Sequence, residues 1–258
     1  MLKRIIAGLA LIPLLIFIII GGIPLYIVES IMLILAINEF YKAFENKDIK
    51  PMYLIGYIAI AYIGIKNLMN IDSFYTGFII FILFLLSMIY LLSEKKNIIE
   101  LSVTFLGIGY IILLFDFIVL TIENFEKGYL YVWLIFIISF CTDTFAYFAG
   151  VMFGKHKLIP KISPKKTIEG SIGGISGSIV GCILFGYLFN LDIILMVCIG
   201  SIGSIVAQMG DLFASSIKRY VGIKDYGNLI PGHGGILDRF DSVILVSPFV
   251  YFMVRLFS

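Results

Sequence analysis

Residues 78–92 read FIIFILFLLSMIYLL, a stretch without a charged side chain and with apolar residues on every face. Residues 5–20, IIAGLALIPLLIFIII, have the same character. The strands of a transmembrane β-barrel alternate apolar and polar residues, and neither stretch alternates. Both stretches therefore predict α-helices that cross a lipid bilayer.

The composition extends this interpretation to the whole chain. Hydrophobic residues make up 60% of the 258 positions, charged residues make up 14%, and the mean hydropathy is +1.07, which is too apolar for one soluble core. A helical span needs about 20 mostly apolar residues, and Gly, Pro and charged residues divide the sequence into such segments. We predict an all-α polytopic membrane protein with about nine transmembrane helices, at residues 4–20, 23–42, 52–70, 74–92, 99–121, 129–153, 169–189, 191–217 and 236–257.

Lysine and arginine predict the orientation of the chain in its membrane. If the N-terminus is cytoplasmic, all but three of the 19 Lys and Arg residues lie on the cytoplasmic side, the exceptions being Lys66, Lys127 and Arg255. This distribution satisfies the positive-inside rule. It predicts a multi-pass protein of the cell membrane whose two long polar loops, residues 154–168 and 218–235, face the cytoplasm.

The character of the sequence changes near residue 140, because the first five predicted helices are rich in Ile, Leu and Phe whereas the last four carry clusters of Gly, Asp and Lys. We predict an N-terminal membrane scaffold over residues 1–128, with lipid-facing surface and dimer contacts, and a C-terminal catalytic region over residues 129–258. Glycines recur at short spacing in the helix at 169–189, which predicts close packing against a neighbouring helix.

The C-terminal region holds a long polar run, residues 215–241, SSIKRYVGIKDYGNLIPGHGGILDRFD. Because polar groups are costly in hydrocarbon, such a run between two apolar segments indicates a function. Just ahead of it and inside it, Asp211, Ser215 and Lys218 are spaced by four and three residues, so they share one face of a helix.

Asp238 and Asp241, spaced by three, share a face at the start of the last predicted helix. The turn before them, residues 231–235 (PGHGG), allows backbone amides to approach an anion, ahead of a helix N-terminus that also favours one. Carboxylates are hard ligands for Mg²⁺, and Lys, Arg and amide donors neutralise phosphate oxygens. The combination predicts a site for a phosphate-bearing substrate together with a divalent cation.

A second polar cluster precedes this run. Asp143 lies inside an apolar predicted helix, and the loop before the next helix reads SPKKT at residues 163–167. Either the Ser or the Thr of this loop caps the helix that follows. Its two lysines are predicted to bind phosphate, whereas Lys155 and Lys157 are interpreted as charges that fix the topology.

The polar residues resemble the signature of a known family, the phosphatidate cytidylyltransferases, also called CDP-diacylglycerol synthases. The resemblance is carried by Ser215-x-Ile217-Lys218-Arg219, Lys224-Asp225, Gly227, Ile230-Pro231, His233-Gly234-Gly235 and Asp238-Arg239-Phe240-Asp241. Asp143, the segment 163–170 and Gly210-Asp211 are similar to other segments that this family shares. The resemblance is strong over residues 140–245 and weak upstream, where it rests on size, hydropathy and Asn38-Glu39-Phe40-Tyr41.

This resemblance implies a polytopic homodimer in a lipid bilayer, with a polar catalytic cavity open to the cytoplasm. It also implies a Mg²⁺-dependent reaction of phospholipid biosynthesis, in which CTP and phosphatidic acid give CDP-diacylglycerol and pyrophosphate. A second metal ion is left open, and no nucleic-acid partner is expected.

The implied reaction brings two polyanions together, so neutralising their charge is the main task of the site. The predicted metal ligands are Asp211 and Asp238, with Asp143 and Asp241 as further candidates. The predicted catalytic residues are Lys165, Lys166, Lys218, Arg219, Lys224, His233 and Arg239. The predicted substrate-binding residues are Ser163, Thr167, Ser215, Gly234 and Gly235. For His233, donation to phosphate and ordering of the glycine turn are equally open.

Two other classes of function stay in view. A secondary transporter also has broken helices and intramembrane carboxylates, but it usually shows related interruptions in both halves of the chain, and here the polar features crowd one half. A CTP-dependent kinase, or a cytidylyltransferase acting on another membrane lipid such as an ether-linked one, shares the demand for metal and phosphate donors. Glu39 and Asp116 line the cavity, form buried hydrogen bonds between helices or lie near a helix end, and the sequence assigns neither a role.

Overall fold

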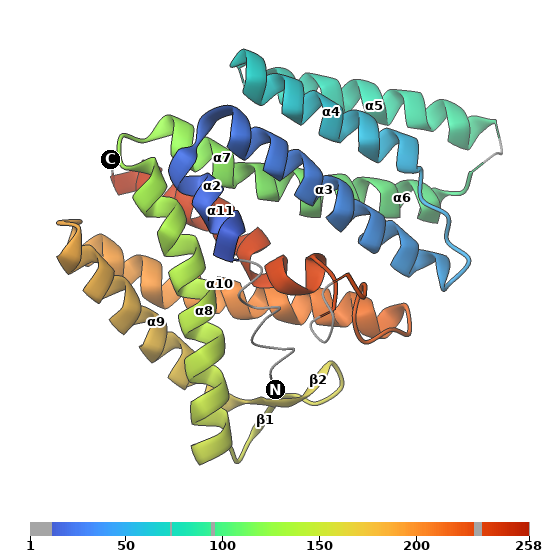
Figure 1. Cartoon of the computed structure of the whole chain (residues 1–258). Helices are drawn as coiled ribbons and strands as arrows, with labels where there is room; N and C mark the ends of the chain where they lie inside the picture. Colours follow the sequence, from blue (N-terminus) through green and yellow to red (C-terminus); the bar gives the residue numbers. More distant parts are fainter. Residues whose placement is uncertain (1–11, 73, 94–95, 230–233, 258) are drawn as a thin grey trace. The chain divides into compact units, whose positions relative to one another are not determined.

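In the computed structural model, residues 12–72, 74–93, 96–229 and 234–257 are described, and these residues form helices and one β-hairpin (Figure 1). The elements are α2 (Ile12–Ile20), α3 (Gly22–Glu45), α4 (Tyr53–Met69), α5 (Phe74–Leu92), α6 (Ile98–Gly107), η1 (Ile108–Leu113), α7 (Leu114–Asn124), α8 (Gly128–Phe153), β1 (Lys157–Ile159), β2 (Ser163–Thr167), α9 (Ile168–Leu188), α10 (Ile193–Tyr220) and α11 (Leu237–Phe257). The π-helical segment η1 joins α6 and α7 into one continuous helix.

Within the described part of the chain, seven helices are long and apolar enough to cross a membrane. They are α3, α5, the continuous helix Ile98–Asn124, α8, α9, α10 and α11. The predicted class, an all-α polytopic membrane protein, is confirmed. The number nine stays a prediction, because α4 is a shorter apolar helix of 17 residues and the first predicted span begins outside the described residues.

The chain divides into two compact units. Residues 1–119 and 221–239 form the N-terminal unit, and residues 120–220 and 240–258 form the C-terminal unit. The limits fall inside α7 and α11, so each of these helices belongs to both units. The N-terminal unit thus includes the middle of the polar run in addition to the first helices.

Helix α3 is the centre of the N-terminal unit, where it packs against α4, α6 and η1. Its side chains Ile37, Phe40 and Tyr41 are fully buried, and the Tyr41 hydroxyl donates to the backbone carbonyl of Thr104 at 2.8 Å. A Cβ atom added to Gly107 would lie 2.6 Å from the Tyr41 ring. The missing side chain at this glycine therefore makes room for the aromatic core.

A buried polar cluster links three helices of the same unit. Lys66 of α4 forms an ion pair with Asp116 of α7, and the Asn67 side chain donates to Glu29 of α3 at 2.8 Å and to Asp116 at 3.2 Å. Each of the four residues is 3% exposed or less. Asp116 thus takes part in hydrogen bonds between helices, the second of the three interpretations that the sequence leaves open for it.

Replacing Lys66 with Met is expected to destabilise the protein by about 3–5 kcal/mol, because it leaves the Asp116 charge buried without its ion-pair partner. Thermal unfolding in detergent measures this loss. Lys127→Met is the matched control, since Lys127 is exposed and carries no side-chain cap of α8. The double variant Lys66→Met, Asp116→Leu should regain much of the loss, and equal melting temperatures for the Lys66 and Lys127 single variants would contradict this account.

In the C-terminal unit, α9 packs against both α8 and α10. A Cβ atom added to Gly173 would lie 2.3 Å from the Ala149 side chain, and one added to Gly177 would lie 2.2 Å from the Phe145 ring. The glycines of α9 therefore allow α8 to approach closely. The predicted packing role of these glycines is confirmed.

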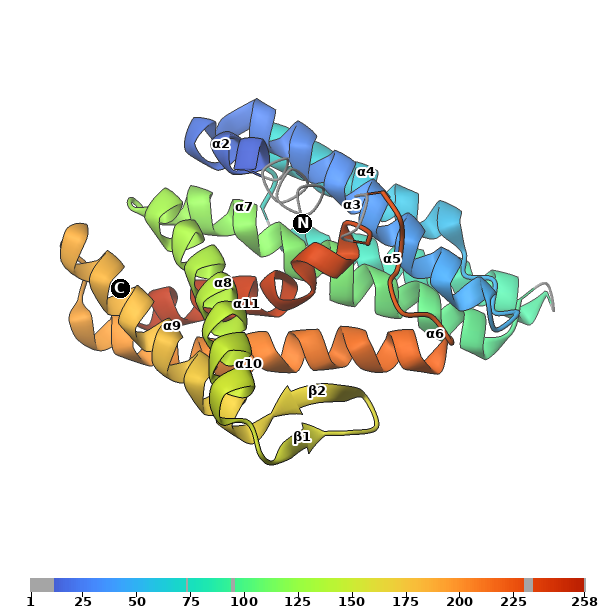
Figure 2. The ribbon, with the colours of Figure 1, turned by 60° about the horizontal axis from the view of Figure 1, so that its bottom comes forward.

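The loop predicted at 154–168 contains a hairpin that the sequence analysis did not predict. Strands β1 and β2 pair antiparallel, with Lys157 opposite Thr167 and Ile159 opposite Ser163 (Figure 2). The pairing satisfies backbone groups that would otherwise need water or side chains as partners. The Thr167 hydroxyl oxygen accepts from the Gly170 amide at 3.1 Å, so Thr167, and not Ser163, is the N-cap of α9.

Candidate active site

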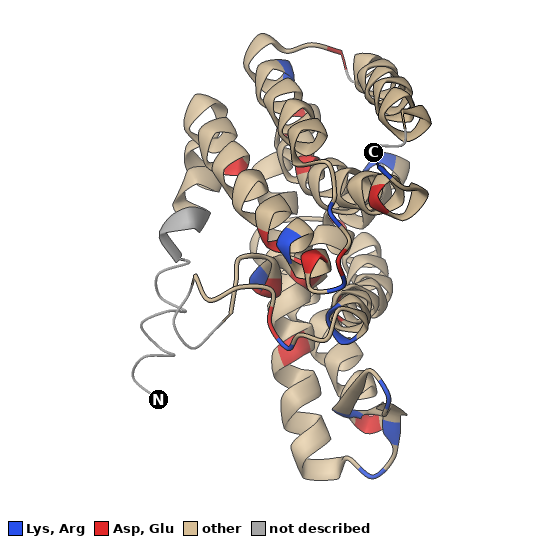
Figure 3. Ribbon diagram, turned by 90° about the vertical axis from the view of Figure 1, so that its right-hand side faces the viewer, with Lys and Arg blue, Asp and Glu red and all other residues tan. Residues whose placement is uncertain are grey.

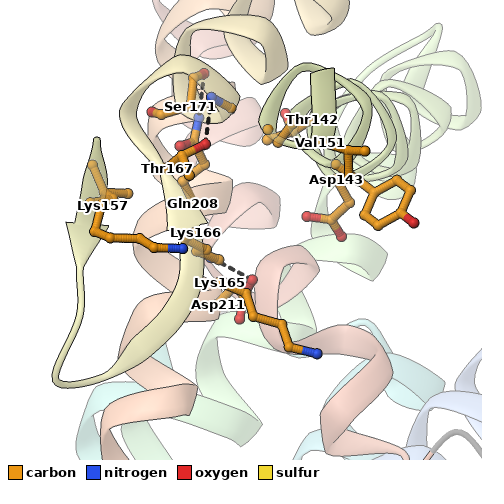
Figure 4. Close-up of a pocket in the computed structure, with 15 residues that line it drawn as sticks. Thr142, Asp143, Val151, Lys157, Lys165, Lys166, Thr167, Ser171, Gln208 and Asp211 are labelled. Atoms are coloured by element: carbon orange, nitrogen blue, oxygen red, sulfur yellow. Dashed lines mark hydrogen bonds and ion pairs between the residues drawn. The ribbon is translucent and has the colours of Figure 1, made fainter. Parts of the chain in front are cut away.

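A cavity of about 450 Å³ opens in the C-terminal unit, between α8, the hairpin, α9 and α10 (Figure 4). Its polar lining consists of Thr142, Asp143, Tyr147, Lys157, Lys165, Lys166, Thr167, Ser171, Gln208 and Asp211. Lysines and carboxylates in one concave site are typical of pockets that bind a charged ligand. Figure 3 shows long stretches of helix without a charged residue, and several Lys or Arg positions on the hairpin.

An ion pair joins the hairpin to α10 inside this cavity. Lys166 Nζ lies 2.5 Å from Asp211 Oδ2, and both side chains are 27% exposed. A pair this exposed contributes at most about 1 kcal/mol to stability. The pair presents a cationic donor and a carboxylate side by side on the wall of the cavity. Figure 4 shows Asp143 of α8 on the wall opposite this pair.

Two polar residues of α10, Ser215 and Gln208, lie one turn after and one turn before Asp211. The Ser215 hydroxyl donates to Asp211 Oδ1 at 3.2 Å, which confirms that the two residues share a face. Gln208, one turn earlier, lines the cavity and donates to the carbonyl of Ser171 at 3.3 Å. Gln208 is not among the residues predicted for the site. Its spacing of three residues from Asp211 in an apolar helix already places the two side chains on one face.

Asp241 of α11 joins the carboxylates of this unit. A Cβ atom added to Gly210 would lie 2.7 Å from the Asp241 carbonyl oxygen, so this glycine lets α11 come close to α10 beside Asp211. Asp241 interacts electrostatically with Asp211, Asp143 and Lys218. Asp241 thus lies within electrostatic range of two other carboxylates and of the buried Lys218.

The fit of this region to a divalent cation follows from its donors. Carboxylate oxygens are the hard ligands that Mg²⁺ prefers, and Asp143, Asp211 and Asp241 supply them. Among the residues that the structure describes, no three His, Cys, Asp or Glu side chains form a ready metal site. Mg²⁺ is commonly held by one or two protein carboxylates together with substrate phosphates, so the donor set fits this mode of binding and not a closed protein cage.

The end of α10 contacts the hairpin. Arg219 Nε donates to the Ile162 carbonyl, in the turn between β1 and β2, at 3.3 Å. At the other end of the hairpin, Glu169 accepts from the Lys155 amide at 3.1 Å and from the His156 ring at 2.7 Å. These contacts anchor the strand that carries the two phosphate-binding candidates, Lys165 and Lys166.

The N-terminal unit holds the rest of the polar run, around the start of α11. Asp238 Oδ2 accepts from the Tyr226 amide at 2.7 Å and from the Gly235 amide at 3.0 Å. Gly234 has a φ of 85°, which favours glycine, and a Cβ atom there would lie 2.7 Å from Asp238 Oδ2. One carboxylate oxygen of Asp238 therefore orders the turn.

Glu39 of α3 reaches the same turn from far away in the sequence. Its carboxylate accepts from the Ile236 amide at 3.0 Å and from the Leu237 amide at 2.9 Å. Together with Asp238, Glu39 engages three successive backbone amides at the start of α11, those of residues 235–237. These amides were expected to approach a substrate anion, and protein carboxylates occupy them instead.

Comparison with known proteins decides the family. The model of the cytidylyltransferase family matches residues 2–257. The chain belongs to this family. It is 35% identical to the phosphatidate cytidylyltransferase of Bacillus subtilis (strain 168) over 270 aligned residues, which cover 100% of this chain and 99% of that relative. It is also similar to the phosphatidate cytidylyltransferases of Staphylococcus aureus (strain COL), at 42% identity, and Staphylococcus haemolyticus (strain JCSC1435), at 44%, each over 150 residues that cover 57% of this chain and 55% of the relative.

The candidate residues of this family member are distributed over both units. Those brought together at the cavity are Asp143, Lys165, Lys166, Thr167 and Asp211, with Ser215, Lys218 and Asp241 close by. Ser163 begins β2 and does not line the cavity, and Arg219 contacts the hairpin turn. Those in the N-terminal unit are Lys224, Gly234, Gly235, Asp238 and Arg239. His233 lies outside the described residues, and Lys157, interpreted as a topological charge, lines the cavity.

Proposed function

We propose that this chain is a phosphatidate cytidylyltransferase, which transfers CMP from CTP to phosphatidic acid and releases pyrophosphate. The observation that carries the proposal is the end-to-end match to a relative of that name. A cavity with three lysines beside two carboxylates supports it, because both substrates are polyanions. The product, CDP-diacylglycerol, places the reaction in phospholipid biosynthesis.

In the proposed reaction, a phosphate oxygen of phosphatidate attacks the α-phosphorus of CTP. A new P–O bond forms, the bond between the α- and β-phosphates breaks, and its electron pair leaves with pyrophosphate. A phosphomonoester is substantially ionised near neutral pH, since its second pKa is about 6, so the attacking oxygen needs no strong general base. The task of the site is to hold the two anions together.

The lysines of the cavity perform this task in the proposed enzyme. Lys157, Lys165 and Lys166 donate to phosphate oxygens and offset their charge as the substrates approach each other. Asp211, with Asp143 or Asp241, would hold Mg²⁺, which supplies further charge neutralisation when bound. Asp238 is a weaker candidate, because one of its oxygens already accepts two backbone amides.

Incubation of the purified protein with CTP and phosphatidate tests the proposal. CDP-lipid and pyrophosphate in equal amounts are the expected products. Phosphorylated lipid with CDP would indicate a kinase instead, and flux across proteoliposomes without chemistry would indicate a transporter. A preference for an ether-linked lipid over phosphatidate would mean that the reaction is as proposed and that its lipid substrate is a different one.

The family resemblance and the charge distribution support three finer proposals. The enzyme requires Mg²⁺, it acts as a homodimer, and its cavity faces the cytoplasm of the cell whose membrane it spans. Size-exclusion chromatography with light scattering in detergent tests the dimer, and turnover in excess chelator tests the metal. Full turnover in chelator would overturn the metal proposal.

The proposed orientation predicts the labelling of two loop positions. Single cysteines at Lys161 and Asn228, in a variant without the three native cysteines, should be protected from an impermeant thiol reagent in intact cells and react after lysis. Lys161 lies in the hairpin turn and Asn228 in the loop before α11. Labelling of both positions in intact cells would invert the orientation.

A further inference from the structure

We propose that Glu39 is a positioning residue of the active site, whose carboxylate fixes the start of α11 through the amides of Ile236 and Leu237. The inference rests on the proposed function, because Asp241, a proposed metal ligand, and Asp238, a weaker candidate, lie on the helix whose start Glu39 holds. Glu39 contacts backbone amides in the described structure. The proposed role involves no contact between Glu39 and the substrate. The sequence analysis assigned it no role.

The contacts of Glu39 replace an N-terminal cap of α11. The first amides of a helix have no partner within the helix, and a carboxylate is favoured beside them by both hydrogen bonding and the helix dipole. Glu39 accepts from the Ile236 and Leu237 amides, at 3.0 and 2.9 Å. Because the cap comes from α3, it ties the beginning of α11 to the core helix of the N-terminal unit.

Two glycines of the signature are explained by the same carboxylate. A Cβ atom added to Gly235 would lie 2.3 Å from both Glu39 carboxylate oxygens, and one added to Gly227 would lie 2.6 Å from Oε1. Neither glycine has a positive φ, so backbone conformation does not require glycine at these positions. Gly227 and Gly235 therefore lie close to the Glu39 carboxylate, and their missing side chains leave room for it.

Glu39 affects the chemistry through the position of the residues on α11. The first turn of α11 carries Asp238 and Arg239, and Asp241 follows on the same helix. Asp238 accepts from the Tyr226 and Gly235 amides, while Glu39 accepts from the next two amides. Two carboxylates thus hold the amides of residues 235–237, and Glu39 occupies the place at the helix N-terminus where an anionic substrate would otherwise bind.

The first test compares Glu39→Gln with Glu45→Gln, an exposed glutamate at the end of the same helix. The Gln side chain keeps one acceptor but turns an NH₂ group towards a backbone amide, so one of the two hydrogen bonds is lost. We expect kcat to fall about 10- to 100-fold in Glu39→Gln, with the KM for CTP changed by less than about threefold, and both to stay unchanged in Glu45→Gln. A large rise in KM with normal kcat would overturn the positioning role and indicate contact with substrate.

A double-mutant cycle tests the contact with the glycine turn. Gly235→Ala should strongly reduce turnover in the presence of Glu39, because the new methyl group meets the carboxylate. In the Glu39→Ala background the same change should cost little more, since the obstructing group is gone. Gly77→Ala is the control, because a Cβ atom there meets nothing within 4 Å. If the fold-losses in turnover of the two single variants multiply in the double variant, the inferred contact is wrong.

Hydrogen exchange separates this inference from the proposed function. In Glu39→Gln, amides in a peptide covering residues 234–239 should exchange faster than in Glu45→Gln, whether or not the protein makes CDP-lipid. An enzyme that makes no CDP-lipid but shows this difference would refute the proposed function and keep the contact. Unchanged exchange together with unchanged kcat would refute the role of Glu39, and this result is decisive even if Glu39→Ala does not fold.

Discussion

Asp211→Asn is expected to lower kcat/KM for CTP by at least about a hundredfold, while the protein remains folded. The change keeps the shape of the side chain and removes its charge. Asp211 then no longer pairs with Lys166, which lies 2.5 Å away, and it loses its value as a ligand for a hard cation. Steady-state kinetics with purified variant and wild type measure the effect.

Asp192→Asn is the matched control, because Asp192 lies just before the first residue of the same helix. Its side chain accepts from the Leu195 amide at 2.8 Å, and Asn performs this capping role nearly as well as Asp. We expect wild-type kinetics for this variant. Full turnover by Asp211→Asn would remove the carboxylate from the chemistry and leave the ion pair as a structural feature.

Lys166→Met should reduce kcat/KM by about 100- to 1,000-fold, because it removes a charged donor from the wall of the cavity. Lys166→Arg should recover only part of this loss, since the planar guanidinium presents its donors in a different geometry from the compact ammonium. Both variants should insert into membranes normally. Activity assays at saturating and at low concentrations of CTP and phosphatidate separate loss of binding from loss of turnover.

The control for this series is Lys161→Met, a change of the same charge in the exposed turn of the same hairpin. If lysines of this loop served only the positive-inside rule, the two Met variants would behave alike, and Lys166→Arg would be fully active. Near-wild-type rates for Lys166→Arg and Lys166→Met would show that Lys166 does not bind phosphate in the reaction.

The helices of this protein are predictable because an apolar segment in a bilayer has to satisfy its own backbone. The limits predicted for the span at 74–92 are those of α5, and the span predicted at 129–153 differs from α8 by one residue. Helix spacing also predicts local parts of the site, such as the pair Asp211 and Ser215. These features depend on residues three or four positions apart.

The missed features depend on contacts that helix spacing does not indicate. The hairpin pairs a Lys-rich segment that lacks the alternation of an ordinary strand, so its sequence reads as a loop. The approach of Lys166 to Asp211 follows from that hairpin and from the glycine packing of α9. Glu39 meets residues 236 and 237 through the folding of the N-terminal unit, and no spacing in the sequence indicates this contact.

In the proposed reaction, the α-phosphorus of CTP is transferred to phosphatidate. Parallel reactions with CTP labelled at the α- or the γ-phosphorus, followed by separation of lipid from water-soluble products, test it most directly. We expect the α-label to enter the lipid fraction and the γ-label to be recovered in pyrophosphate, and we expect Asp211→Asn to slow the appearance of both labels greatly. Entry of the γ-label into lipid, or of neither label, would contradict the proposed reaction.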